Sequence, residues 1–191
     1  SYASKRFQKN ISTWAWFVQA DCIPECLMRF SLIDRIVELE PGSRITAIKS
    51  LTMAEEYLGD HFPNFPVMPG VLMLEALTQA GAWLVRVSED FAHSIVVLKQ
   101  ANNVKYAQFV EPGQTLTVKV DIISMDANEV RLKGVGTVNG RLTVGARLTL
   151  ARYNLGDSNP LHIETDAATC RDLREQLVLL YQPQYETTKS E

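Results

Sequence analysis

The stretch GDHFPNFPVMPGVLMLEAL, residues 59–77, brings several reactive groups close together in the sequence. His61 can act as a base near neutral pH, and Glu75 can give a proton if its carboxyl stays neutral. Gly70 has no side chain to block a ligand, and its N–H and that of Val71 are free donors if a helix begins there. Such donors can hold a carbonyl oxygen that gains negative charge. Together these groups suit proton abstraction next to a carbonyl, followed by loss of a β-substituent.

Two of these residues also have ordinary structural interpretations. Glu75 could be a carboxylate that hydrogen-bonds Gln79, one turn further along a helix. His61 could be a loop histidine that hydrogen-bonds a backbone carbonyl. Spacing alone does not separate these interpretations from the catalytic one.

The segment VLMLEALTQAGAWLVRV, residues 71–87, predicts the helix that would carry Glu75. It contains helix-forming residues, no interior proline and one glycine. Pro69-Gly70 precedes it, and proline is favoured where a helix begins. Apolar side chains lie on nearly every side, which is typical of a buried helix. Glu75 must then be hydrogen-bonded or used, because burying a bare charge is costly.

Strands are predicted on both sides of this helix. Apolar and polar residues alternate in residues 44–52, 114–126 and 129–153, and residues 93–110 predict one or two more strands. Asn139-Gly140 interrupts the last run, which is a strong hairpin signal. The sequence therefore predicts an α+β fold in which an antiparallel sheet wraps one long central helix.

The two ends of the chain differ from this body, so three regions are expected. Residues 1–27 form an N-terminal extension in which Trp14, Trp16 and Phe17 could pack as a helix, residues 28–152 form the main domain, and residues 153–191 form a C-terminal extension.

A second, amphipathic helix is predicted at about residues 166–182, capped by Thr165 or Asp166. Its apolar stripe consists of Leu173, Leu177 and Leu180. Because its polar face carries both signs of charge, we expect it to pack on the domain edge rather than on a membrane.

Composition narrows the class of protein. The 191 residues are 46% apolar and 21% charged, which is the balance of a folded globular domain. Lys plus Arg is 19 and Asp plus Glu is 22, so the net charge of -3 argues against nucleic acid as a partner. No apolar run is long enough to span a bilayer, and the basic N-terminus followed by a short apolar stretch only faintly resembles a signal peptide.

The three cysteines, Cys22, Cys26 and Cys170, do not form a disulfide pattern, and no second pair with metal-ligand spacing follows the first two. Free thiols in a reducing cytoplasm are the expected interpretation, and no metal site is predicted.

The stretch HFPNFPVMPGVLMLEALTQAG resembles the signature of the β-hydroxyacyl-acyl carrier protein dehydratases of the hotdog fold, whose pattern is roughly G-H-F-P-x-x-P-V-M-P-G-V-L-x-x-E-A-x-x-Q. The match includes the separation of His61 and Glu75. Residues 31–52 and 103–120 resemble the flanking family segments, so the likeness covers about residues 28–152.

The resemblance implies a central helix wrapped by an antiparallel sheet, and a homodimer in which two sheets join edge to edge, with trimers of dimers as a further assembly. Each active site would take its histidine from one subunit and its acid from the other. The substrate would be a (3R)-3-hydroxyacyl thioester on acyl carrier protein or coenzyme A, and the product a trans-2-enoyl thioester. No cofactor is implied.

Carried over to this chain, the family roles fall on named residues. His61 would remove the α-proton, and Glu75, through a water, would help the 3-hydroxyl to leave. The Gly70 N–H would polarise the thioester carbonyl. The Val67 carbonyl would orient His61, and Gln79 would hold Glu75.

The chain departs from the family pattern at several places. Asp60 replaces the glycine before the histidine, and its carboxylate would favour the imidazolium form of His61 if the two side chains approach. Ala107 and Gln108 replace a basic pair that helps to dock the acidic carrier protein. A substitute basic patch is expected from other cations, namely Arg44, Lys49, Arg86, Lys99 and Lys105.

Other functions remain open at this point. A hotdog thioesterase would use the helix start and an acid to direct water, without the His61–Glu75 pair in this spacing. A non-catalytic acyl-thioester-binding hotdog protein would usually lack that pair. A dehydratase of polyketide or specialised lipid synthesis would keep it.

Overall fold

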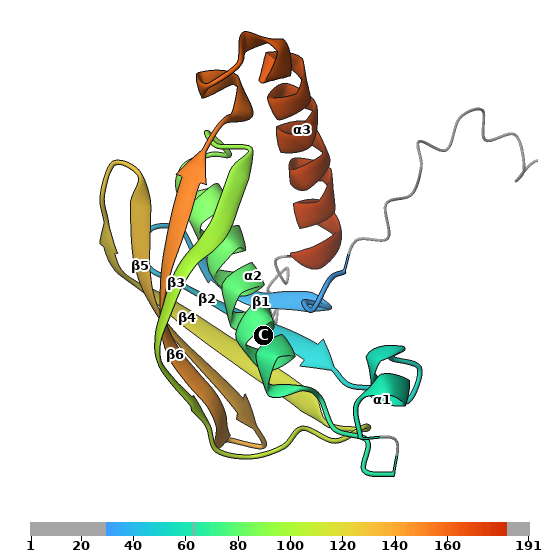
Figure 1. The fold of residues 1–191 in the computed structure, drawn as a ribbon. Helices are drawn as coiled ribbons and strands as arrows, with labels where there is room; N and C mark the ends of the chain where they lie inside the picture. Colours follow the sequence, from blue (N-terminus) through green and yellow to red (C-terminus); the bar gives the residue numbers. More distant parts are fainter. Residues whose placement is uncertain (1–29, 63, 183–191) are drawn as a thin grey trace, which may run out of the picture. The chain divides into compact units, whose positions relative to one another are not determined.

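Six antiparallel strands form one sheet in the computed structural model, which describes residues 30–62 and 64–182 (Figure 1). The strands are β1 (Arg35–Glu40), β2 (Arg44–Ser50), β3 (Ile95–Tyr106), β4 (Thr115–Met125), β5 (Glu129–Val138) and β6 (Arg141–Tyr153). Their order across the sheet is β1-β2-β4-β5-β6-β3, and every neighbouring pair is antiparallel.

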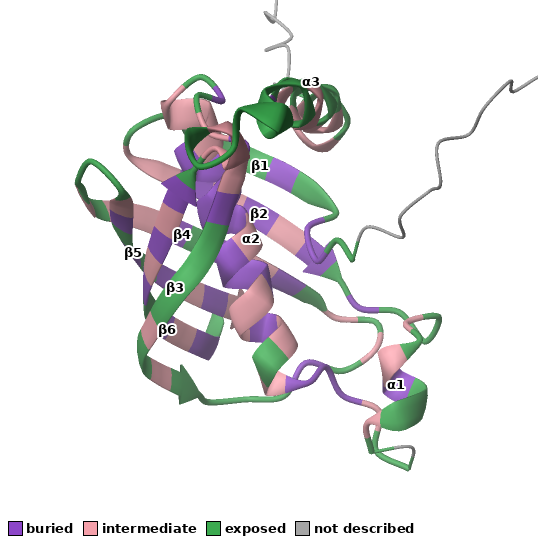
Figure 2. Cartoon of the chain, turned by 45° about the horizontal axis from the view of Figure 1, so that its top comes forward, coloured by how far each residue is buried: buried purple, intermediate pink, exposed green. Residues whose placement is uncertain are grey.

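Helix α2 (Gly70–Ser88) lies along one face of this sheet and contacts five of its strands, β2 to β6. The side chains that alternate toward the helix are fully buried, as in Leu116, Val118 and Val120 of β4. On the helix, the buried residues run from Met73 to Val85 (Figure 2). The prediction of one long helix with an antiparallel sheet around it is confirmed.

The predicted hairpin at Asn139-Gly140 joins β5 to β6. Both residues have a positive φ, 50° at Asn139 and 75° at Gly140, which the tight turns of two-residue hairpins require. The one or two strands predicted for residues 93–110 are a single long strand, β3.

Strand β3 is an edge of the sheet, and most of its residues are exposed (Figure 2). Its pairing with β6 shifts register twice, between Leu98 and Gln100 and again between Asn102 and Lys105. An exposed edge strand offers unpaired backbone groups to another strand.

The C-terminal helix α3 (Ile163–Leu180) starts earlier than the sequence predicts. The predicted caps, Thr165 and Asp166, are wrong, because two short 3₁₀ turns, η1 (Leu155–Asp157) and η2 (Pro160–His162), lead directly into the helix. The predicted apolar stripe does pack against the core, together with Cys170, through Leu173, Leu177 and Leu180.

Asp166 holds the start of α3 in place rather than capping it. Its buried carboxylate accepts hydrogen bonds from the hydroxyl of Ser94, from the N–H of Leu155 at 3.1 Å and from the N–H of Gly156 at 2.7 Å. These donors, the Ser94 hydroxyl first, outweigh burial and hold the pKa of Asp166 below its ordinary value.

We expect Asp166→Asn to lower the melting temperature at neutral pH, because an amide nitrogen would face one of these donors. A group whose pKa is lowered by folding stabilises the protein above its unfolded pKa, and this stability is lost as pH falls through the folded pKa. The difference between variant and wild type should therefore shrink in acid. Thermal melts from neutral to acid pH test this prediction. The control is Glu164→Gln, which changes an exposed carboxylate in the same turn of the helix. A difference in melting temperature between Asp166→Asn and wild type that does not depend on pH would contradict the prediction.

The described compact unit begins at Ser31. The predicted packing of Trp14, Trp16 and Phe17, like Cys22 and Cys26, lies outside the described residues, and the domain limits at 27/28 and 152/153 stay predictions. Among the residues described, no helix is both long and apolar enough to cross a membrane.

Candidate active site

The start of α2 presents two backbone donors that have no acceptor among the described residues. Pro69 caps the helix, and its carbonyl accepts the N–H groups of Leu72 at 2.9 Å and Met73 at 3.2 Å. The N–H groups of Gly70 and Val71 donate to no described residue. Because they lie at the positive end of the helix dipole, they can bind an oxygen that carries partial negative charge.

Tyr106, the last residue of β3, contacts this helix start and was not singled out by the sequence. A β-carbon added to Gly70 would lie 3.1 Å from Cε1 and 3.2 Å from Cδ1 of the Tyr106 ring. The ring therefore lies directly against Gly70. No sequence pattern signals this contact, because it joins the end of a strand to the start of a helix.

Glu75 lies on α2 and is partly buried. Its Oε1 accepts a hydrogen bond from Nε2 of Gln79 at 3.0 Å, so the pair expected from the spacing is present. Oε1 of Gln79 in turn accepts the N–H of Leu32 at 2.8 Å. Gln79 thus orients the carboxyl of Glu75 and is itself held by the chain that precedes β1.

His61 follows the short helix α1 (Tyr57–Asp60), which the sequence did not predict. Its N–H donates to the carbonyl of Tyr57 at 3.1 Å, and its ring centroid lies 4.4 Å from that of Phe62. The imidazole makes no hydrogen bond or ion pair with a described residue. The sequence suggested that the imidazole could donate a hydrogen bond to a backbone carbonyl, such as that of Val67. No such hydrogen bond is present among the described residues.

Asp60 ends α1 and is exposed. No ion pair joins its carboxylate to His61 in the part of the chain that the structure describes. Asp60, which stands where the family pattern has glycine, therefore forms no ion pair with the imidazole of His61 among the described residues.

Within one chain, His61 and Glu75 are not brought together. No hydrogen bond, ion pair or ring contact between them occurs among the described residues, and α1 stands to the side of α2 in both views (Figures 1 and 2). Within one chain, the imidazole of His61 and the carboxyl of Glu75 therefore make no direct contact.

Apolar side chains are exposed at the start of α2, in the segment before it and after β3. Phe65 and Phe109 pack edge to face with their centroids 5.6 Å apart, and each is at least half exposed. Phe62 and Val71 are exposed to a similar degree. Exposed apolar side chains that pack on one another, as Phe65 and Phe109 do, are typical of an interface or a binding groove. Trp83 and Phe91, by contrast, are buried in the core.

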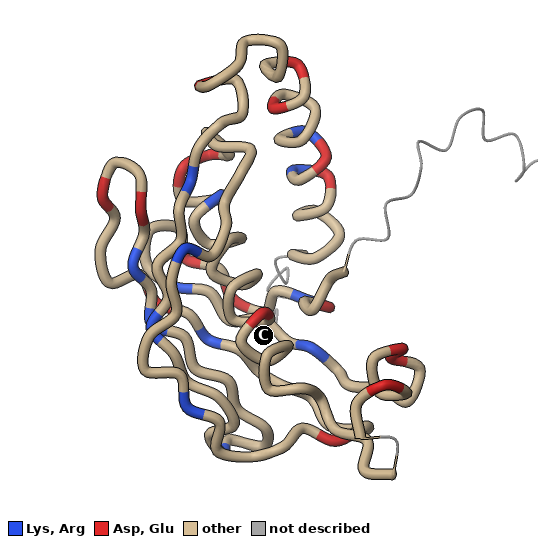
Figure 3. Tube along the Cα trace, viewed as in Figure 1, with Lys and Arg blue, Asp and Glu red and all other residues tan. Residues whose placement is uncertain are grey.

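The structure corrects part of the basic patch expected from the sequence, whereas Lys105 is exposed as expected. Lys49 is buried, and burial lowers the pKa of Arg86 to about 10. Arg44 and Lys99 are paired with carboxylates. Exposed cations lie on the strands of the sheet, whereas the charged residues around α1 are acidic (Figure 3). The exposed cations that form no ion pair with a described residue include Lys119, Lys133 and Arg147.

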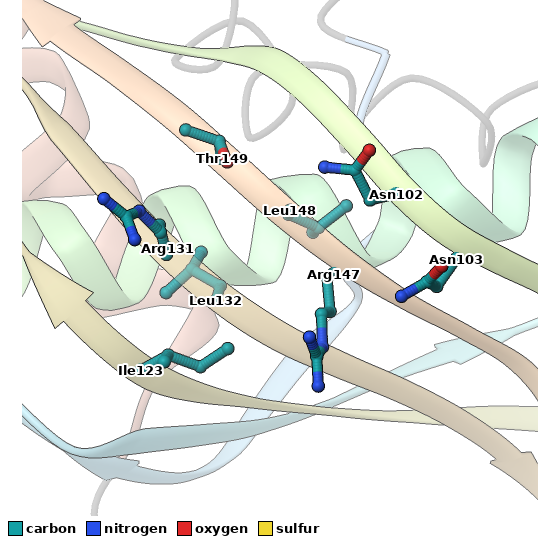
Figure 4. A pocket seen from close by; sticks show the side chains of 8 residues that line it. All are labelled: Asn102, Asn103, Ile123, Arg131, Leu132, Arg147, Leu148 and Thr149. Carbon is teal, nitrogen blue, oxygen red and sulfur yellow. The ribbon is translucent and has the colours of Figure 1, made fainter.

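One hollow of about 450 Å³ lies on strands β3 to β6, away from these residues (Figure 4). Arg131, Arg147, Asn102 and Asn103 are among its lining, and none of the predicted site residues is. Among the described residues, no group of three His, Cys, Asp or Glu side chains is arranged to hold a metal ion.

Solved structures with a similar fold have little sequence in common with this chain. The dehydratase heterocomplex ApeI:P from Xenorhabdus doucetiae aligns with a TM-score of 0.56 at 16% identity, over 70% of this chain and 90% of that chain. Protein smu.793 from Streptococcus mutans, bound to acetyl CoA, aligns with a TM-score of 0.52 at 15% identity, over 68% and 94% of the two chains. The predicted hotdog fold is confirmed.

Curated relatives are closer in sequence. The 3-hydroxyacyl-acyl-carrier-protein dehydratase FabZ of Aromatoleum aromaticum is 42% identical over 130 residues, which is 66% of this chain and 89% of that protein. The protein of the same name from Geobacillus thermodenitrificans is 39% identical over 128 residues, 67% and 86% of the two chains. The model of the FabA-like domain matches residues 24–150. The chain therefore belongs to the family of FabA-like domains.

Proposed function

We propose that the protein is a hydro-lyase that dehydrates (3R)-3-hydroxyacyl thioesters to trans-2-enoyl thioesters in fatty acid biosynthesis. The observation that carries this proposal is the start of α2. It combines two backbone N–H groups that donate to no described residue with the carboxyl of Glu75, which Gln79 holds on the same helix. The dehydratase name of the curated relatives supports it.

Each group has a defined part in this reaction. The N–H groups of Gly70 and Val71 bind the thioester oxygen, which gains negative charge when the α-proton leaves. The imidazole of His61 takes that proton. Glu75, through a water molecule, protonates the 3-hydroxyl, which departs as water while the double bond forms.

The working site is proposed to lie between two subunits, with His61 from one and Glu75 from the other. Three observations support this arrangement: no contact joins the two residues in the described chain, β3 is an exposed edge, and apolar side chains are exposed at the helix start and before it. Pairing of two β3 strands would join the sheets of a homodimer. Trimers of dimers are the further assembly proposed.

The substrate carrier is proposed to be acyl carrier protein, and coenzyme A is the alternative. The purified protein should be given (3R)-3-hydroxyacyl thioesters of both carriers, and the enoyl thioester followed by its ultraviolet absorbance. Turnover with the carrier protein at higher kcat/KM is the expected result. Release of free thiol without enoyl product would identify a thioesterase, and binding without turnover a non-catalytic protein. A cytoplasmic location stays a prediction.

We expect Gly70→Ala to reduce kcat/KM by about tenfold or more, because a methyl group would stand beside the donors that bind the thioester oxygen. The new β-carbon would also press on the Tyr106 ring, which is half exposed and can move. The melting temperature should therefore change little. Steady-state kinetics and a thermal melt measure the two effects.

Gly59→Ala is the matched control, since a β-carbon there meets nothing within 4 Å. If Gly70→Ala turned over substrate like the wild type, the helix start would not be the oxygen-binding site.

A further inference from the structure

Lys49 is a charged residue that the proposed chemistry does not use, and yet it is buried. It lies on the inward-facing side of β2, and only 7% of its surface is exposed. An ammonium group inside a protein costs free energy unless carboxylates or other acceptors pair with it.

Two carboxylates surround this ammonium group. Nζ of Lys49 lies 2.8 Å from Oε1 of Glu55 and 3.2 Å from Oδ1 of Asp34. Burial opposes the charge, but the two carboxylates outweigh it and raise the pKa of Lys49 above its ordinary value. Lys49 is therefore charged at neutral pH and bridges two segments of the chain.

Asp34 is fixed to the sheet. Its second carboxylate oxygen accepts the N–H of Ser50 at 2.7 Å, and its own N–H donates to the carbonyl of Ile48 at 2.9 Å. One end of the bridge is thus attached to β2 by backbone as well as side-chain hydrogen bonds.

Glu55 belongs to the segment that leads into α1. Its carbonyl accepts the N–H of Leu58 at 3.1 Å, and Leu58 is buried. The carbonyl of Tyr57 then accepts the N–H of His61. Burial first, and then the nearby Glu55 and Asp34, raise the pKa of Tyr57, so that its hydroxyl stays neutral beside the bridge.

We propose that Lys49 is a positioning residue for His61: by bridging Asp34 and Glu55, it ties α1 to the sheet and fixes the place from which the imidazole reaches the substrate. This inference rests on the proposed function for its kinetic consequence, but the position of the imidazole can be measured without any reaction. A displacement of a reacting group by about 1 Å can cost as much as 10²-fold in rate.

Two variants break the bridge in different ways. Lys49→Met removes the ammonium group and keeps the length of the side chain, whereas Glu55→Gln leaves Lys49 paired with Asp34. In both we expect kcat to fall by about ten- to a hundredfold while KM changes little. Lys49→Arg, which can span the same two carboxylates, should restore most of the rate.

Arg44→Met is the matched control. Arg44 lies on the same strand, and its Nε is 2.8 Å from Glu40, but the pair is exposed on the other face. This variant loses an ion pair of β2 without touching α1, so its kcat should equal that of the wild type.

A second readout is independent of activity. The chain has three histidines, His61, His93 and His162, so their imidazole signals can be followed by NMR in this 191-residue chain. The His61 signals, assigned by their loss in His61→Ala, should shift in Lys49→Met and Glu55→Gln, while those of His93 and His162 stay in place. Thermal melts establish that each variant is folded.

Unchanged His61 signals together with unchanged kcat in folded Glu55→Gln would overturn the positioning role. If the wild type turned over no substrate, the proposed reaction would fail. The shift of the His61 signals alone would then decide whether Lys49 positions the histidine.

Discussion

Replacing His61 with alanine is expected to lower the rate of dehydration by about 10²-fold or more, the usual scale of a lost general base. The imidazole makes no hydrogen bond with a described residue, and its ring contacts that of Phe62. Its removal should therefore leave the fold and the melting temperature nearly unchanged. Steady-state assays with a 3-hydroxyacyl thioester and a thermal melt give both values.

His162→Ala serves as the control, because His162 is exposed and lies in η2, at the start of α3. Its turnover should match that of the wild type. Equal rates in His61→Ala and wild type would remove His61 from the reaction, whatever the effect of other substitutions.

Mixing two inactive variants is expected to restore activity. In the proposed homodimer, His61→Ala and Glu75→Gln each lose one proposed catalytic group in every site. In a mixed dimer whose sites take the base from one chain and the acid from the other, one of the two sites contains both native residues. Random mixing makes half of the dimers mixed, so about a quarter of the wild-type activity should return.

The variants should carry different affinity tags and be unfolded and refolded together, so that mixed dimers can be purified and counted. His61→Ala refolded with itself is the control and should stay inactive. Mixed dimers that form but show no activity would mean that both residues act within one chain, contrary to the separate places of His61 and Glu75 in the structure.

The sheet and the central helix could be predicted from the sequence because their signals are local. Alternation in residues 115–122 marks which side of β4 is buried, and Asn139-Gly140 marks the turn between β5 and β6. The start of α2 was also predictable, since Pro69-Gly70 precedes a long helix-forming run.

Features that depend on distant contacts were missed or misplaced. Asp166 was expected to cap α3, but its partners, Ser94, Leu155 and Gly156, belong to other segments. Lys49 was expected to be part of a surface patch, but the strand turns it inward to meet two carboxylates. From sequence alone, a charged residue in a strand is expected to be exposed, because the groups that could pair with its charge inside the protein are not known.

In the candidate site, too, the residues that lie close together in the sequence could be predicted, whereas the contacts between distant residues could not. His61, Gly70 and Glu75 lie in one short stretch, so their types and spacing could be read directly. The contacts of Gly70 with Tyr106 and of Gln79 with Leu32 join residues far apart in the chain, and no periodicity reveals such pairs.

The contact between Gly70 and Tyr106 limits how this chain can diverge. A β-carbon at position 70 would lie 3.1 Å from the aromatic ring, so a larger residue there requires the Tyr106 ring to move or a smaller residue at position 106. Tyr106 also ends the edge strand, so the same ring is exposed to whatever covers that edge. Substitutions at the helix start and at the end of β3 are therefore not independent, and variation at these two positions should be correlated.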